Sequence, residues 1–93
     1  MTARAHRSWA LRFHPQARKA LLRLDADAQR RILKTLHAMS HLEDPRVRGA
    51  GLRGNLTGFW RYRIGDYRVI CELIDSELVI LVVEIGHRSS IYR

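Results

Sequence analysis

Three arginines surround a short turn in the stretch Gly58-Phe-Trp-Arg-Tyr-Arg-Ile-Gly-Asp-Tyr-Arg-Val-Ile70. Gly65-Asp66 lies between two runs rich in aromatic and β-branched residues, and such a pair with glycine first is typical of a two-residue hairpin turn. With this turn, Arg63 lies directly opposite Arg68. Arginine is a bidentate ligand for phosphate, so the pattern indicates a place where an anion is bound.

Arg61 lies two positions before Arg63 and therefore shares its face of the strand. The side chains expected on the other face are mostly aromatic or apolar: Trp60, Tyr62, Tyr67 and Val69. Like charges directly opposite each other across two strands are destabilising. The sequence leaves two interpretations open, a face built to receive an anion or solvated arginines on an open sheet surface.

The whole chain is strongly basic. It has 93 residues, enough for one domain over residues 1–93, and 17 Lys and Arg against 9 Asp and Glu give a net charge of +8. This charge favours a polyanionic partner, either nucleic acid or an acidic protein segment. The positive charge is concentrated between Arg46 and Arg68, where Arg48 and Arg53 are further candidate RNA contacts beside Arg61.

Other kinds of chemistry find little support. Cys71 is the single cysteine, which excludes an intrachain disulfide, and we expect it to be a small buried residue. His37 and His41 have a spacing that can bind metal but lack a third ligand, and the dispersed acids argue against a two-metal nuclease. Since no phosphate-binding loop is present either, we expect no metal and no cofactor.

The start of the chain does not resemble a targeting segment. Residues 1–12 carry scattered charges without a long apolar run, and no stretch has the length of a membrane span. The sequence therefore predicts a cytoplasmic protein without a membrane partner.

The order of elements predicts an α+β domain. A short strand at 9–13 precedes a helix that begins at Pro15, and Asp25 or Asp27 caps a second helix with Ile32, Leu36 and Met39 on its apolar face. A loop over 45–58 leads to three strands at 57–64, 67–74 and 78–85. We expect an N-terminal strand, a two-helix hairpin and an antiparallel β-meander, with the helices packed on one face of a single sheet.

Cleavage of RNA without a metal ion would use arginine, histidine and tyrosine side chains. It needs a base for the 2′-hydroxyl, cations for the phosphate, an acid for the departing 5′-oxygen and a flat surface for a nucleotide base. The arginines and Tyr92 supply the cations and the flat surface, and His87 titrates in the range of a base or an acid. His87 can equally be a strand-end residue that bonds backbone or water.

Several short motifs resemble the RelE branch of the RelE/ParE toxins. They are Leu52-Arg-Gly54, Trp60-Arg-Tyr-Arg63, Gly65-Asp-Tyr-Arg-Val-Ile70, and Ile85-Gly-His-Arg88 followed by Ile91-Tyr92. The order of elements matches as well, so the resemblance covers nearly the whole chain. It implies an mRNA interferase that cleaves the codon in the ribosomal A site, and a cognate antitoxin that forms a hetero-oligomer with the toxin.

The resemblance also implies roles for individual residues. Arg61 and Arg63 stand where RelE toxins have lysines, and the lysine at the Arg63 position is proposed there as the base. Arg68 and Arg88 match the arginines that bind the phosphate and the leaving group, and Tyr92 matches a base-stacking tyrosine. Because arginine stays protonated, proton removal here passes to His87 or Tyr92, or the arginines act only electrostatically.

Two other functions compete with RNA cleavage. A ParE-like toxin has the same fold but inhibits DNA gyrase by binding the protein, and ParE-type chains generally lack the clustered arginines and the terminal tyrosine. The third possibility is a non-catalytic basic module that binds nucleic acid.

Overall fold

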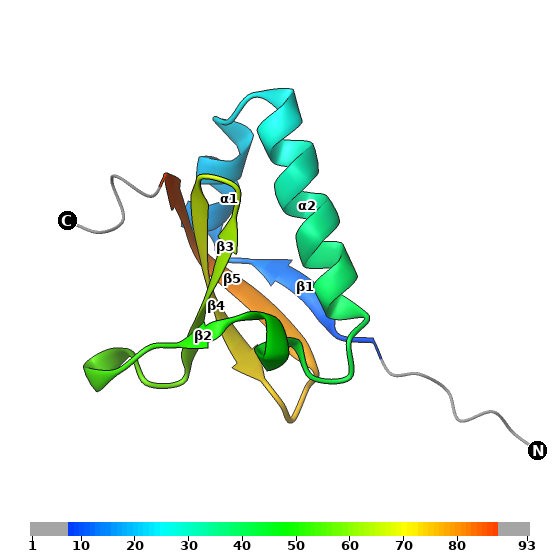
Figure 1. Cartoon of the computed structure of the whole chain (residues 1–93), viewed down its shortest axis with the longest axis vertical. Coiled ribbons are helices and arrows are strands. Elements are labelled where there is room, and N and C mark those ends of the chain that lie inside the picture. Colours follow the sequence, from blue (N-terminus) through cyan, green and yellow to red (C-terminus); the bar gives the residue numbers. More distant parts are fainter. Residues whose placement is uncertain (1–7, 88–93) are drawn as a thin grey trace, which may run out of the picture.

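The fold is a five-stranded sheet with two helices on one of its faces (Figure 1). The structure, a computed structural model, describes residues 8–87. The sheet has the order β1-β5-β4-β3-β2, and its strands are β1 (Ala10–Phe13), β2 (Ala50–Gly51), β3 (Phe59–Ile64), β4 (Tyr67–Ile74) and β5 (Val79–His87). β3, β4 and β5 form the predicted antiparallel meander.

Local signals define both helices. α1 (Pro15–Leu22) begins with proline at its first position, and α2 (Ala26–Ser40) is capped by Asp25, whose carboxylate accepts a hydrogen bond of 2.8 Å from the Ala28 backbone N–H. The prediction that an aspartate caps the second helix is thus confirmed for Asp25.

The core lies between the helices and one face of the sheet. Ile32, Leu36 and Met39 of α2 are buried, as predicted from their helical spacing. They belong to one cluster with inward-facing strand residues such as Val69 and Ile80. The placement of both helices over a single face is therefore confirmed, and among residues 8–87 no α-helix covers the opposite face of β3 and β4.

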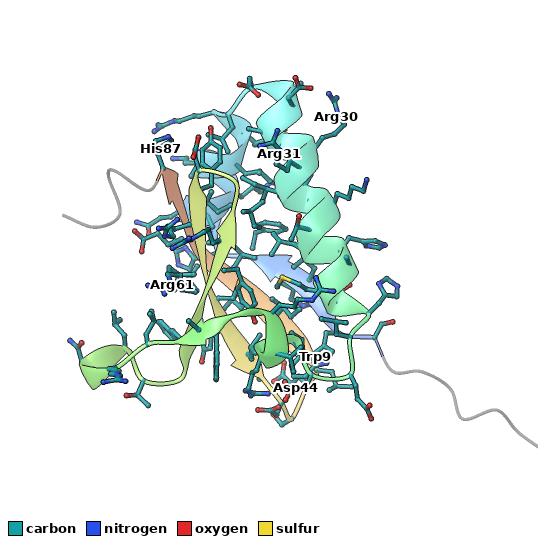
Figure 2. All side chains as sticks on the ribbon, viewed as in Figure 1. Trp9, Arg30, Arg31, Asp44, Arg61 and His87 are labelled. Carbon is teal, nitrogen blue, oxygen red and sulfur yellow. The ribbon has the colours of Figure 1, made fainter. Side chains whose placement is uncertain are left out.

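The β3–β4 hairpin has the register predicted from its turn. Arg63 pairs with Arg68 across the two strands, and Gly65 has a φ of 60°, which suits glycine at the first position of a type II′ turn. A Cβ atom at Gly65 would lie 2.9 Å from the Arg31 guanidinium. Figure 2 shows this arginine of α2 beside the tip of the hairpin.

A β-bulge interrupts the pairing of β4 with β5. Ile70 pairs with Glu84 and Cys71 pairs with Val82, so Val83 is one extra residue on β5. An extra residue reverses the alternation of side chains beyond it. Ile85 and His87 consequently face the helices, and Glu84 faces the open side of the sheet.

Several sequence-based boundaries need correction, and the strand expected at 9–13 begins at Ala10. The strand expected at 57–64 begins at Phe59, and the strand expected at 78–85 covers Val79–His87. The loop expected at 45–58 contains two 3₁₀ helices, η1 (Pro45–Arg48) and η2 (Gly54–Leu56), with β2 between them. The predicted N-terminal strand β1 joins the sheet by pairing in parallel with β5, and the sheet gains one unpredicted strand, β2, which pairs with β3.

Leu78 explains the late start of β5. Its φ of 54° is in the left-handed region, so it belongs to the preceding turn and not to an extended strand. Its side chain nevertheless packs against the core.

Candidate nucleic-acid interface

Arg61, Arg63 and Arg68 share the open face of the sheet. They extend over two neighbouring strands, and Figure 2 shows Arg61 on the side of the sheet away from α2. We call these three residues the arginine row. Their exposure differs, because Arg63 is exposed, Arg61 is partly exposed and Arg68 is only 6% exposed.

The burial of Arg68 disagrees with the interpretation that all three arginines are solvated on an open sheet surface. Arg68 lies on β4, the middle strand of the sheet, between Arg63 on β3 and Gly86 on β5. Arg68 is therefore held by its surroundings, while the side chain of Arg63 reaches solvent. A buried cation beside an exposed one suits the binding of a phosphate group.

Two carboxylates share this face, which the sequence-based analysis did not identify. Glu72 pairs with Phe59 on β3, and Glu84 pairs with Ile70 on β4. Strand alternation alone would have revealed Glu72. Glu84 could not be found in this way, because its orientation depends on the bulge at Val83.

His87 does not share the face of the arginine row. It pairs with Tyr67, and the two rings meet edge to face with their centroids 5.6 Å apart. Since Tyr67 follows the hairpin turn on the helix-facing side, His87 faces that side too. The structure thus separates one predicted catalytic residue from the arginines.

The other predicted residues lie away from the arginine row or outside residues 8–87. Arg48 is exposed at the end of η1, and Arg53 is exposed at the start of η2. These two arginines flank β2 at the edge of the sheet. Arg88 and Tyr92 lie outside the described residues.

A cleft of about 260 Å³ opens beside the arginine row. Leu52 and Leu56 of the β2–β3 connection form one wall, and Phe59 of β3 lies at the start of the strand that carries Arg61. The remaining lining residues are Arg61, Ile70, Val83 and Glu84. We call it the Phe59 cleft; it is apolar except for one arginine and one carboxylate.

Ion pairs and a cation–π contact of Arg46 hold the loop that precedes β2. The Arg46 guanidinium donates to Asp44 at 3.0 Å and to Asp75 at 2.6 Å, and it lies 5.7 Å from the centre of the Trp60 ring. The hydrogen bond to Asp75 is the main reason why the pKa of Arg46 is raised. These contacts join the η1 segment to the β4–β5 turn. Arg46 therefore has a structural role.

Tyr62 anchors the same loop from inside the core. Its hydroxyl donates to the Pro45 carbonyl at 3.0 Å, and burial raises the pKa of this phenol. Tyr62 is thus a structural residue.

Cys71 is completely buried, as predicted, and burial raises the pKa of its thiol to about 12. A buried thiol with a raised pKa is a poor nucleophile.

Within residues 8–87, no group of three or more His, Cys, Asp or Glu residues is arranged to hold a metal ion. No helix in the described part of the chain is long and apolar enough to cross a membrane.

Comparison with known proteins identifies a family and a fold. The sequence model of a family described as the ParE toxin of type II toxin–antitoxin systems, parDE, matches residues 11–92. A search of the curated proteins finds no match to this sequence.

Solved structures of toxins are similar to this chain. The archaeal RelE–RelB complex from Pyrococcus horikoshii is 28% identical, with a TM-score of 0.70 over 89% of this chain and 98% of that chain. The isolated RelE toxin of E. coli is 27% identical, with a TM-score of 0.73 over 91% and 92% of the two chains. The RelBE2 toxin–antitoxin complex of Mycobacterium tuberculosis has 24% identity and a TM-score of 0.79 over 89% and 94%, which shows the same fold.

Proposed function

The chain belongs to the ParE toxin family of type II toxin–antitoxin systems, within the RelE/ParE superfamily, and we propose that it is a ribosome-dependent endoribonuclease that cleaves mRNA. The observation that carries this proposal is the arginine row. Arg63 and Arg68 pair directly across β3 and β4, with Arg63 exposed and Arg68 buried, and Arg61 lies on the same face. Three arginines gathered on one face suit a phosphate group, because a guanidinium group is a bidentate phosphate ligand.

The proposed reaction exchanges one phosphorus–oxygen bond for another and moves two protons. The 2′-oxygen of a ribose loses its proton and bonds to the adjacent phosphorus, while the bond from phosphorus to the 5′-oxygen breaks and that oxygen takes a proton. The negative charge that develops on the phosphate oxygens is stabilised by cations held in place before the reaction. Arg61, Arg63 and Arg68 supply this charge in the proposal, and Arg88 and Tyr92 keep the leaving-group and base-stacking roles that the resemblance implies.

The arginines act electrostatically in this scheme. An arginine stays protonated and is a poor base, so Arg63 does not take the proton that a lysine at its position is proposed to take. His87 faces Tyr67 on the other side of the sheet. We therefore do not assign the proton transfer to His87, and Tyr92 remains the candidate base from the sequence.

The proposed partners are an antitoxin, the ribosome and its mRNA, in the cytoplasm. Among the similar structures, the toxins from P. horikoshii and M. tuberculosis were solved in complex with their antitoxins. A net charge of +8 suits an antitoxin segment rich in acidic residues. We propose that this segment covers part of the arginine row and thereby excludes RNA.

Inhibition of DNA gyrase is the second candidate function, because the matching family model is that of ParE toxins. A purified toxin added to a translation extract distinguishes the two. Primer extension should find discrete 5′ ends within codons of the mRNA if the chain is a nuclease. Intact mRNA together with inhibited supercoiling in a purified gyrase assay would instead establish the ParE-like activity.

A further inference from the structure

The Phe59 cleft has the composition of a small-ligand site. Its walls are apolar, from Leu52, Leu56, Phe59, Ile70 and Val83, and its polar groups are only Arg61 and Glu84. Ligand sites generally combine apolar walls with a few well-placed polar groups, and their usual volumes begin near ~300 Å³. At about 260 Å³, this cleft has room for one planar ring system.

The cleft lies next to the place proposed for the scissile phosphate. Arg61 lines the cleft and is two residues from Arg63, a separation of about 6.8 Å along a strand. The nucleotide adjacent to a phosphate held by Arg63 and Arg68 is therefore within reach of the cleft. This position also suits the charges, because Arg61 can contact the backbone of the nucleotide that enters.

The loop that forms one wall is fixed by its own hydrogen bonds. The Leu52 N–H donates to the Phe59 carbonyl at 3.0 Å, and the Thr57 hydroxyl donates to the Gly54 carbonyl at 2.7 Å. Leu56 is thus held over the sheet although nearly half of its surface is exposed. An exposed leucine held in this way is available to pack on the face of a base.

Glu84 determines which base fits. A carboxylate offers two acceptor oxygens and no donor. Guanine has two adjacent N–H donors, N1–H and the 2-amino group, on its Watson–Crick edge. In adenine, cytosine and uracil the donor on that edge is flanked by an acceptor, which a carboxylate repels. Within residues 8–87, no salt bridge engages Glu84.

We propose that the Phe59 cleft binds a guanine of the mRNA next to the cut, with Phe59 and Leu56 against the base and Glu84 accepting from its Watson–Crick edge. This inference rests on the proposed nuclease function and adds a base preference to it. The resemblance gives no role to Glu84 or to the apolar residues of the cleft, although Leu52 and Ile70 belong to the motifs that carry it. Glu84 is here a specificity-determining residue and not a catalytic one.

The test compares cleavage patterns of the toxin, Glu84→Gln and the matched control Glu72→Gln. Both substitutions remove one negative charge from the same face, but only Glu84 lines the cleft. Primer extension in a translation extract would score cuts in an mRNA that contains all codons. We expect the parent and Glu72→Gln to favour guanine at one position beside the cut, and Glu84→Gln to lose roughly five- to a hundredfold of that preference.

A second variant tests the apolar wall. Leu56→Ser should reduce cutting at guanine sites more than at other sites, because it removes one contact to the base. The circular dichroism spectrum of each variant should match that of the parent.

The remaining outcomes would overturn either the guanine site or the proposed nuclease function. If the parent cuts RNA but without a guanine preference, or if Glu84→Gln keeps the preference, the guanine site is wrong and the nuclease function stands. If Glu84→Gln abolishes all cutting, Glu84 serves the reaction and not base selection. If variants of the cleft only weaken antitoxin binding, the cleft belongs to that partner. If the parent cuts no RNA, the proposed function fails and this inference fails with it.

Discussion

Arg63 and Arg68 carry like charges on neighbouring strands. They form a directly opposed pair on adjacent strands, with Arg68 buried and Arg63 exposed. Opposed like charges destabilise a strand pair by a fraction of a kcal/mol to about 1 kcal/mol. Residues kept despite such a cost are typical of functional sites, where activity and stability are in conflict.

Replacing Arg63 by threonine should therefore stabilise the protein. We expect Arg63→Thr to raise the free energy of unfolding by roughly 0.2–1 kcal/mol, because it removes the repulsion and threonine suits a strand. Urea denaturation measures this change. Arg61→Thr is the matched control, since Arg61 pairs with Ile70 and not with another cation. A loss of stability in Arg63→Thr would show that the arginine pair does not repel.

Cys71 should make the stability depend on pH in the alkaline range. Burial raises the pKa of its thiol from 9.0 to about 12, so the unfolded chain loses this proton at a lower pH than the folded protein does. Stability then falls as the pH rises from about 9 towards 12. Between pH 9 and 10, we expect the parent to lose about 1 kcal/mol more than Cys71→Ala in urea denaturation. Equal slopes for the two proteins would contradict this burial effect.

At the scale of elements, the sequence predicts what local chemistry determines. The glycine-first turn at Gly65-Asp66 fixes the register of β3 and β4, and Asp25 caps α2. The bulge at Val83 has no comparable signal, because all residues around it from Leu78 to Val83 are apolar. The orientations of Glu84 and His87 depend on this bulge. The sequence-based predictions therefore omit Glu84 from the open face and place His87 with the arginines.

The short strand β2 also escaped prediction, for a different reason. It has only two residues, Ala50–Gly51, and it forms because tertiary contacts hold its ends. One such contact is the close approach of Gly49 to the ring of Tyr62. Position 49 needs glycine because a Cβ atom there would meet the Tyr62 ring. The glycines and the proline of residues 45–58 favoured a loop, and β2 was therefore not predicted.

A methyl group at Gly49 should disturb this approach. A Cβ atom there would lie 2.7 Å from Cε1 of Tyr62, whose hydroxyl is fixed to the Pro45 carbonyl. Overpacking of this kind costs typically 1–3 kcal/mol, and we expect Gly49→Ala to lose about that much stability in urea denaturation. Gly51→Ala is the control, because its Cβ would lie at an ordinary 3.4 Å from Trp60. Similar stabilities for the two variants would contradict the role of Gly49.

At the scale of the whole molecule, the core and the proposed functional site occupy different faces of the sheet. The helices and the core cover one face (Figure 1), and the arginine row and the Phe59 cleft lie on the other, where Figure 2 shows Arg61. Substitutions on the open face can therefore change activity without loss of the core. The net charge of +8 adds a general attraction to RNA that does not depend on any single residue.

The account is tested most directly by the rate at which Arg63→Thr cleaves mRNA on ribosomes. Loss of one preorganised charge beside a developing anion lowers a rate about a hundred- to a thousandfold, and we expect a loss of that size. Arg18→Gln is the control, because it removes the same charge from the exposed surface of α1. The account predicts that Arg18→Gln cleaves like the parent while Arg63→Thr, although folded, is nearly inactive. Cleavage by Arg63→Thr at the rate of the parent would contradict the assignment of the arginine row as the nuclease site.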